Sequence, residues 1–103
     1  MKCLMWTFAT MDGNVREARK YAHKAHELAD RNPAVAKWCI AMARHHLEFN
    51  QEGMAIYQKD LHDMQHMPEY AALYPGVKAV HDERMAELER ETAEVRAMLE
   101  THK

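Results

Sequence analysis

The fold is decided by residues 33–67, which read PAVAKWCIAMARHHLEFNQEGMAIYQKDLHDMQHM. Asn32, directly before this stretch, is a good helix N-cap, and Pro33 suits the first helical position because its missing N–H would have no partner there. Within the stretch, mostly apolar or small residues recur at alternating spacings of four and three. This row comprises Ala36, Ile40, Ala43, Leu47, Asn50, Met54, Tyr57, Leu61 and Met64. The spacing predicts one long helix over 33–67 with a continuous buried face.

A second row with the same spacing runs beside the first along this stretch. It comprises Cys39, Met42, His46, Phe49, Gly53 and Ile56. A helix that is apolar on two sides needs neighbours on both sides. The pattern therefore predicts packing partners beyond one adjacent helix.

Two further helices flank this segment. Asn14 with Glu17 three residues later is typical of a capping box, so a helix is predicted over 14–30. Its inward face is rich in alanine, which allows two helices to approach closely. After the turn signal Pro75-Gly76, another helix is predicted over 76–102.

The chain is expected to form one all-α domain over residues 1–103. An apolar N-terminal arm at 1–13 precedes a shorter helix and a long antiparallel helical hairpin. Few Val, Ile and Thr residues are present, which argues against a sheet. Because the core is thin and the long helix is apolar on two sides, we expect a homodimer that buries Phe49 and Ile56 and completes a four-helix-like bundle.

Antiparallel packing predicts which residues face each other. Between the first two helices, Ala25 is expected opposite Trp38 and Glu17 opposite His46. Between the last two, Thr92 lies at the height of Asn50 on the long helix. We therefore expect these two polar side chains to hydrogen-bond, directly or through water.

Charge and cysteine usage exclude several functions. Fourteen basic residues against sixteen acidic ones give a net charge of −2, which argues against nucleic-acid or membrane-surface binding. No apolar run is long enough to cross a bilayer, and residues 1–11 lack the pattern of a secretory signal. Cys3 and Cys39 do not have zinc-finger spacing. A cytoplasmic location is expected.

The helix over 76–102 is acidic, and the helix over 14–30 carries a basic cluster of Arg16, Arg19, Lys20 and Lys24. This opposite bias allows the two helices to pair. The alternative is two solvated faces with local ion pairs, such as Glu87 with Arg90 and Arg90 with Glu94.

No catalytic motif is present in the sequence. It contains no glycine-rich phosphate loop, no nucleophile elbow and no HExxH. Cys39 lies in an apolar row without a base, as expected for an inert packed thiol. These absences favour a non-enzymatic role.

Histidines provide the candidate metal ligands. His62 and His66 are four residues apart with Asp63 between them, a spacing able to bind a transition metal. The alternative is a solvated helix face. His46 is the inward member of an adjacent pair, and it is either a ligand or a hydrogen-bonded core residue.

Three segments resemble short phage and prophage proteins described as ferritin-like or rubrerythrin-like helical hairpins. They are residues 21–29 (YAHKAHELA), residues 38–50 and residues 76–82 (GVKAVHD). The resemblance covers residues 14–100, and it aligns Ala43 and His46 with the Glu-x-x-His motif of those relatives. It implies a helical-hairpin fold and a phage origin. It also implies a degenerate site for iron or another transition metal, with His46, Glu17 and Glu27 as candidate ligands.

Two functions are consistent with these sequence features. The first is a non-enzymatic homo-oligomeric module for binding or assembly, without a cofactor, that has a further protein partner. The alternative is a degenerate ferritin-like protein that binds iron or another transition metal between its helices. A third hypothesis is an inhibitor of another protein that acts through the apolar arm at residues 4–8.

Overall fold

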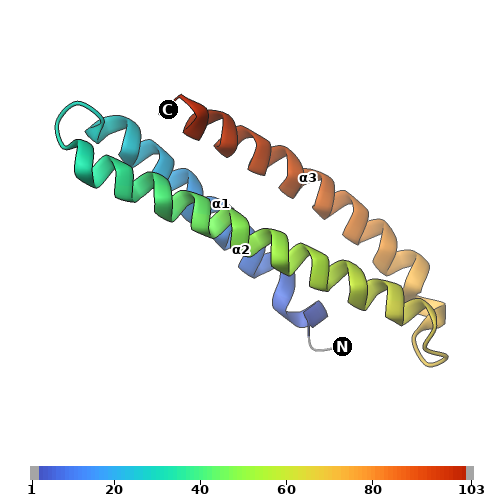
Figure 1. Cartoon of the computed structure of the whole chain (residues 1–103). Coiled ribbons are helices and arrows are strands. Elements are labelled where there is room, and N and C mark those ends of the chain that lie inside the picture. The colour runs from blue at the N-terminus through green and yellow to red at the C-terminus, as the bar shows by residue number, and fades with distance from the viewer. Residues whose placement is uncertain (1–2, 102–103) are drawn as a thin grey trace.

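A computed structural model shows an elongated, all-helical molecule measuring 58 × 20 × 18 Å. It describes the backbone of residues 3–101 and the side chains from Phe8 onward. The elements in chain order are α1 (Cys3–Leu28), α2 (Pro33–Gln65), the short 3-10 helix η1 (Ala71–Leu73) and α3 (Tyr74–Glu100). Helices α1 and α2 form a closely packed hairpin, and α3 runs along it antiparallel to α2 (Figure 1). The expected all-α class is confirmed.

Helix α1 begins at Cys3, so the predicted helix start at Asn14 is wrong, and residues 3–13 of the predicted apolar arm belong to the helix. Met11 and Val15 lie on one face of the continuous helix and are both buried. Because this apolar face runs on through Gly13, tertiary packing extends the helix past the capping signal. Residues 4–7 of the predicted arm have side chains outside the described part of the chain.

The core lies between α1 and the other two helices. On α1, the fully buried Ala18, Ala22 and Ala25 allow the backbones of α1 and α2 to approach closely. Helix α3 adds a row of buried side chains that includes Leu88 and Val95. Each such residue contributes about 1.5–3 kcal/mol on burial.

The hairpin turn is set by its caps. Helix α1 ends at Leu28, two residues before the predicted end at Asp30. Helix α2 begins as predicted, because the Asn32 Oδ1 accepts a hydrogen bond from the backbone N–H of Val35 at 3.3 Å.

With this earlier turn, the contacts between α1 and α2 are displaced by two to four residues from the predicted pairing. Tyr21, and not the predicted Ala25, lies against Trp38, with ring centroids 5.6 Å apart. Trp38 therefore sits at the edge of the hairpin and is more than half exposed.

The connection between α2 and α3 occupies residues 66–73 and contains η1. Helix α2 ends two residues before the predicted boundary at 67. Helix α3 is displaced by two residues from the predicted range 76–102.

Ion pairs join α3 to α1. Arg19 contacts Glu94 at 3.1 Å, and Arg84 pairs with Asp12. Helix-to-helix pairing of opposite charge is therefore present within the chain, together with the local pair Arg90–Glu94. Such exposed pairs contribute about 0–1 kcal/mol each, so they orient α3 more than they stabilise it. In the part of the chain that is described, no helix is both long and apolar enough to span a membrane.

Candidate interaction surfaces

A stripe of large apolar side chains is exposed along α2. Val35, Trp38, Phe49 and Ile56 have exposed fractions of 39%, 54%, 41% and 45%, and Met42 between them is half-buried. We call these five residues the outer stripe. Val35, Met42, Phe49 and Ile56 are each seven residues apart, the repeat by which two helices pack along a seam. Contiguous exposed apolar surface of this kind marks an interaction site more often than scattered residues do.

The outer stripe faces away from α3. Gln51 and Met54 on α2 line a groove shared with α3. Successive helical residues are rotated by about 100°, so Phe49 points roughly opposite to Gln51. The outer stripe therefore lies away from the groove that α2 shares with α3, and its side chains are only partly exposed.

Helix α1 supports the first half of the outer stripe. The ring of Tyr21 meets Trp38 edge-on, at an interplanar angle of 84°. The same ring stacks on His46, with centroids 5.9 Å apart and an angle of 15°. Trp38 is thus held in place by an aromatic contact while its other surface stays accessible.

His46 and Asn50 take part in a polar cluster between α1 and α2. The His46 Nδ1 lies 2.9 Å from the Asn14 Oδ1, so Asn14 serves as a hydrogen-bond partner and not as the predicted cap. The Asn50 Nδ2 donates to the Met11 carbonyl at 2.9 Å. His46 therefore faces Asn14, one turn from the predicted Glu17.

The predicted direct hydrogen bond between Asn50 and Thr92 is wrong. Among the described atoms, the Asn50 Oδ1 and the Thr92 Oγ1 are buried and lack a hydrogen-bond partner. At this height Thr92 lines an open groove of about 540 Å³ between α2 and α3. A water bridge between them stays a prediction.

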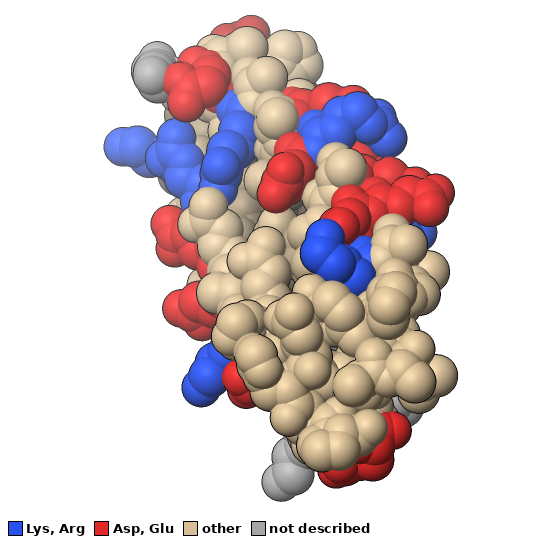
Figure 2. Space-filling view, turned by 90° about the vertical axis from the view of Figure 1, so that its right-hand side faces the viewer, with Lys and Arg blue, Asp and Glu red and all other residues tan. Residues whose placement is uncertain are grey.

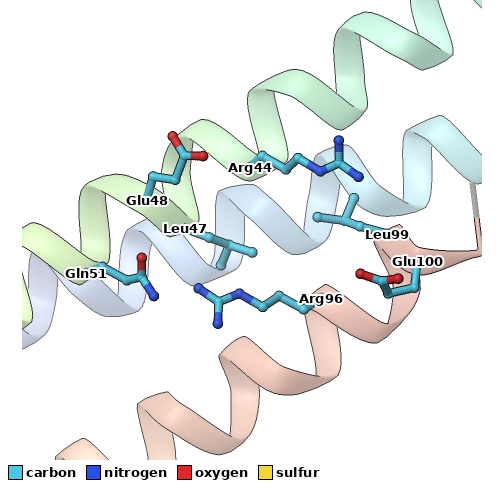
Figure 3. Close-up of a pocket in the computed structure, with 7 residues that line it drawn as sticks. All are labelled: Arg44, Leu47, Glu48, Gln51, Arg96, Leu99 and Glu100. Carbon is cyan, nitrogen blue, oxygen red and sulfur yellow. The ribbon is translucent and has the colours of Figure 1, made fainter. Parts of the chain in front are cut away.

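The groove continues toward the end of α3 as a second hollow of about 270 Å³. Figure 3 shows Leu47 and Leu99 between the two helices, with the charged ends of Arg44 and Arg96 on either side. Glu48 and Glu100 add negative charge to the same rim. This hollow therefore has a small apolar floor and a rim of mixed charge.

Another apolar surface covers the end of the molecule at the α2–α3 connection. Figure 2 shows a largely uncharged surface there, whereas most of the charged side chains lie toward the other end. Tyr70, Leu73 and Val80 are exposed in this region.

An aromatic cluster joins all three helices beneath this end. Phe8 and His81 both pack on Tyr57, each with centroids 4.7 Å from its ring. Burial raises the pKa of Tyr57. His81 is buried, and its Nδ1 lies 3.3 Å from the Asp82 Oδ1. The cluster fixes the start of α3 against the hairpin.

The exposed Asp82 also pairs with Lys78 at 2.5 Å. Hydrogen bonds, first from Lys78 and then from His81, lower the pKa of Asp82. The hydrogen bond to Asp82 raises the pKa of Lys78. Both shifts arise mainly from the exposed Lys78–Asp82 pair, and the buried His81 adds to that of Asp82.

The five candidate metal ligands do not come together at one site. Glu17 and His46 are half-buried, and His46 contacts Asn14. Glu27 is exposed and contacts Lys24 at 3.5 Å. His62 and His66 are exposed neighbours with ring centroids 5.1 Å apart. Within the described part of the chain, no three His, Cys, Asp or Glu residues are grouped to hold one metal ion. The expected packed thiol is present, because Cys39 is buried and free.

Sequence reasoning missed the contacts of Asn14 and Tyr21. Both lie at i, i+7 on α1, on the side that faces His46, and this spacing is the signal that could have found them. This spacing was not recognised because the predicted helix began at Asn14 and Glu17 was expected opposite His46. Comparisons with protein-family models, with curated proteins and with solved structures find no match to this chain.

Proposed function

We propose that this chain is a non-enzymatic helical assembly module that forms a homodimer through the outer stripe of α2. In this proposal, the dimer places its helices side by side and presents them to a further protein partner. The proposal includes a cytoplasmic location and a relationship to the phage ferritin-like hairpins, which rests on the residues of the three resembling segments.

The observation that carries the proposal is the heptad spacing of the outer stripe. Large apolar side chains are costly to leave in water, at about 25 cal/mol per Å² of apolar surface. From Val35 to Ile56 the stripe extends over about 32 Å of helix at 1.5 Å per residue. A second helix of the same kind can cover that length, as helices do in bundles.

Phe49→Glu and Ile56→Glu test this proposal. Each places a carboxylate in the seam, where burial without a partner is unfavourable. We expect the wild-type chain to be a dimer at micromolar concentration by light scattering, and each variant to dissociate at least tenfold more readily.

Val80→Glu is the matched control. Val80 is more exposed than any residue of the outer stripe but lies on α3. We expect this variant to keep the wild-type dimer, and circular dichroism should show unchanged helix content in all three variants. A monodisperse wild-type monomer, or equal weakening by Val80→Glu, contradicts the proposal.

A further inference from the structure

We infer that the occupant of the outer stripe is the α2 helix of a second copy, docked antiparallel with Phe49 at the two-fold axis. This inference rests on the proposed function, which requires self-association but does not state an orientation. It is carried by the residues that border the stripe.

A second row of exposed positions runs beside the stripe, also at intervals of seven residues. Trp38, which belongs to the stripe, begins this row, and His45, Glu52 and Lys59 continue it. The row therefore contains one aromatic ring, one imidazole, one acid and one base. Among the described residues, neither Glu52 nor Lys59 has an ion-pair partner within the chain.

Antiparallel docking about Phe49 makes this row complementary to itself. His45 lies four residues before Phe49 and Glu52 three residues after it, so each meets the other across the axis. Trp38 and Lys59 lie eleven residues before and ten after, so the ammonium group reaches the exposed indole. A cation over a Trp face is favourable, and so is an imidazole next to a carboxylate.

The part of the apolar row from Met42 to Ile56 has the same centre. Met42 and Ile56 are each seven residues from Phe49, so they face each other across the axis, and Phe49 faces its own copy. One register therefore pairs the second row together with Met42, Phe49 and Ile56, as an isologous two-fold interface requires. Val35, fourteen residues before Phe49, faces Asp63 in this register and lies outside the apolar centre.

Parallel docking gives the opposite result. A two-fold axis along the helices puts every residue at the height of its own copy. Glu52 then meets Glu52 and Lys59 meets Lys59, which is unfavourable along a helix seam. The backbone dipoles of two parallel helices also repel, whereas those of antiparallel helices attract.

A charge swap within one chain tests the orientation. In the antiparallel dimer, His45→Glu sets a carboxylate against Glu52 twice, and we expect the dissociation constant from sedimentation equilibrium to rise about tenfold. Adding Glu52→Lys to His45→Glu restores opposite charges at both contacts, so the double variant should return to within threefold of wild type. In a parallel dimer, the double variant still places like charges together.

Cysteine trapping gives a second, independent readout. Chains carrying His45→Cys and chains carrying Glu52→Cys are oxidised separately and as a mixture, with the wild-type chain as the control for Cys3 and Cys39. We expect a disulfide between positions 45 and 52 in the mixture, identified by peptide mass, and little cross-linking of either variant alone.

The outcomes separate the two proposals. A wild-type monomer overturns both the assembly function and the docking geometry. A wild-type dimer that does not weaken with His45→Glu, or is not rescued by the double variant, overturns only the antiparallel geometry. Efficient cross-linking between two chains that both carry Glu52→Cys also overturns only the antiparallel geometry.

Discussion

At the residue scale, the most informative positions are the buried polar side chains. Asn50 satisfies its donor with the Met11 carbonyl, whereas its oxygen and the Thr92 hydroxyl stay without a hydrogen-bond partner among the described atoms. A buried, unsatisfied polar group costs about 1–3 kcal/mol. Thr92 lines the groove between α2 and α3, and neither of these oxygens has a hydrogen-bond partner on the facing helix among the described residues.

Thr92→Val is expected to stabilise the protein. The two side chains have nearly the same shape, and valine removes a buried hydroxyl that lacks a partner, so the free energy of unfolding should rise by about 1 kcal/mol. Urea denaturation of wild type and variant measures this difference.

Thr101→Val is the matched control for that substitution. The Thr101 hydroxyl donates to the Met98 carbonyl at 2.7 Å on an exposed surface, so this variant should gain no stability. Destabilisation by Thr92→Val would instead support a water molecule that joins Thr92 to Asn50.

At the element scale, α1 shows how a local signal is overruled by packing. Asn14 has the right neighbour for a capping box, yet the helix continues through it because Met11 and Val15 both have core positions to fill. Gly13 lies inside this helix with a negative φ, and a Cβ added there meets nothing within 4 Å.

Gly13→Ala is therefore expected to stabilise α1. Alanine loses less backbone entropy than glycine in a helix, a gain of about 1 kcal/mol at an interior position. Thermal denaturation followed by circular dichroism should show a midpoint higher by about 4–8 °C.

Gly76→Ala provides the comparison, since its added Cβ also meets nothing within 4 Å but it lies in the first turn of α3. We expect a smaller gain there. A Gly13→Ala variant no more stable than wild type would show that residue 13 is not in a stable helix.

The success of sequence reasoning also differs between elements. The row from Ala36 to Met64 identified the long helix because its period is repeated many times, and most of these residues are buried. The predicted pairing of α1 with α2 differs from the observed contacts by two to four residues. It depends on where α1 ends, and no residue near Leu28 gives a strong signal for a helix end. The Asn50–Thr92 bond failed for a related reason, because equal height along two helices does not determine the distance between them.

The candidate surface was partly visible in the sequence. The second apolar row named Met42, Phe49 and Ile56, whose accessible stripe is the main feature of α2. The sequence prediction set Trp38 against the alanine face of the first helix, opposite Ala25. In the structure Trp38 belongs to the outer stripe, because its ring packs against Tyr21.

At the scale of the whole molecule, the arrangement of the helices can be compared with what each proposed function, assembly or metal binding, requires. A carboxylate-bridged metal site in a helical bundle needs ligands from several helices that converge at one height. Here His46 is turned toward Asn14, and Glu27 is at the surface with Lys24. The apolar stripe, in contrast, continues along most of α2.

Metal analysis of protein purified without a histidine tag tests this distinction. His62 and His66 supply two ligands, fewer than the three or four protein ligands of a zinc site, so any metal bound there should be removed by mild chelation. We expect less than 0.1 metal ion per chain, on the order of adventitious binding, and no change in the dimer after chelation. A His62→Ala, His66→Ala variant should remove the residual metal. Stoichiometric iron retained by both proteins would contradict this expectation and favour the metal-binding alternative with His46 as a ligand.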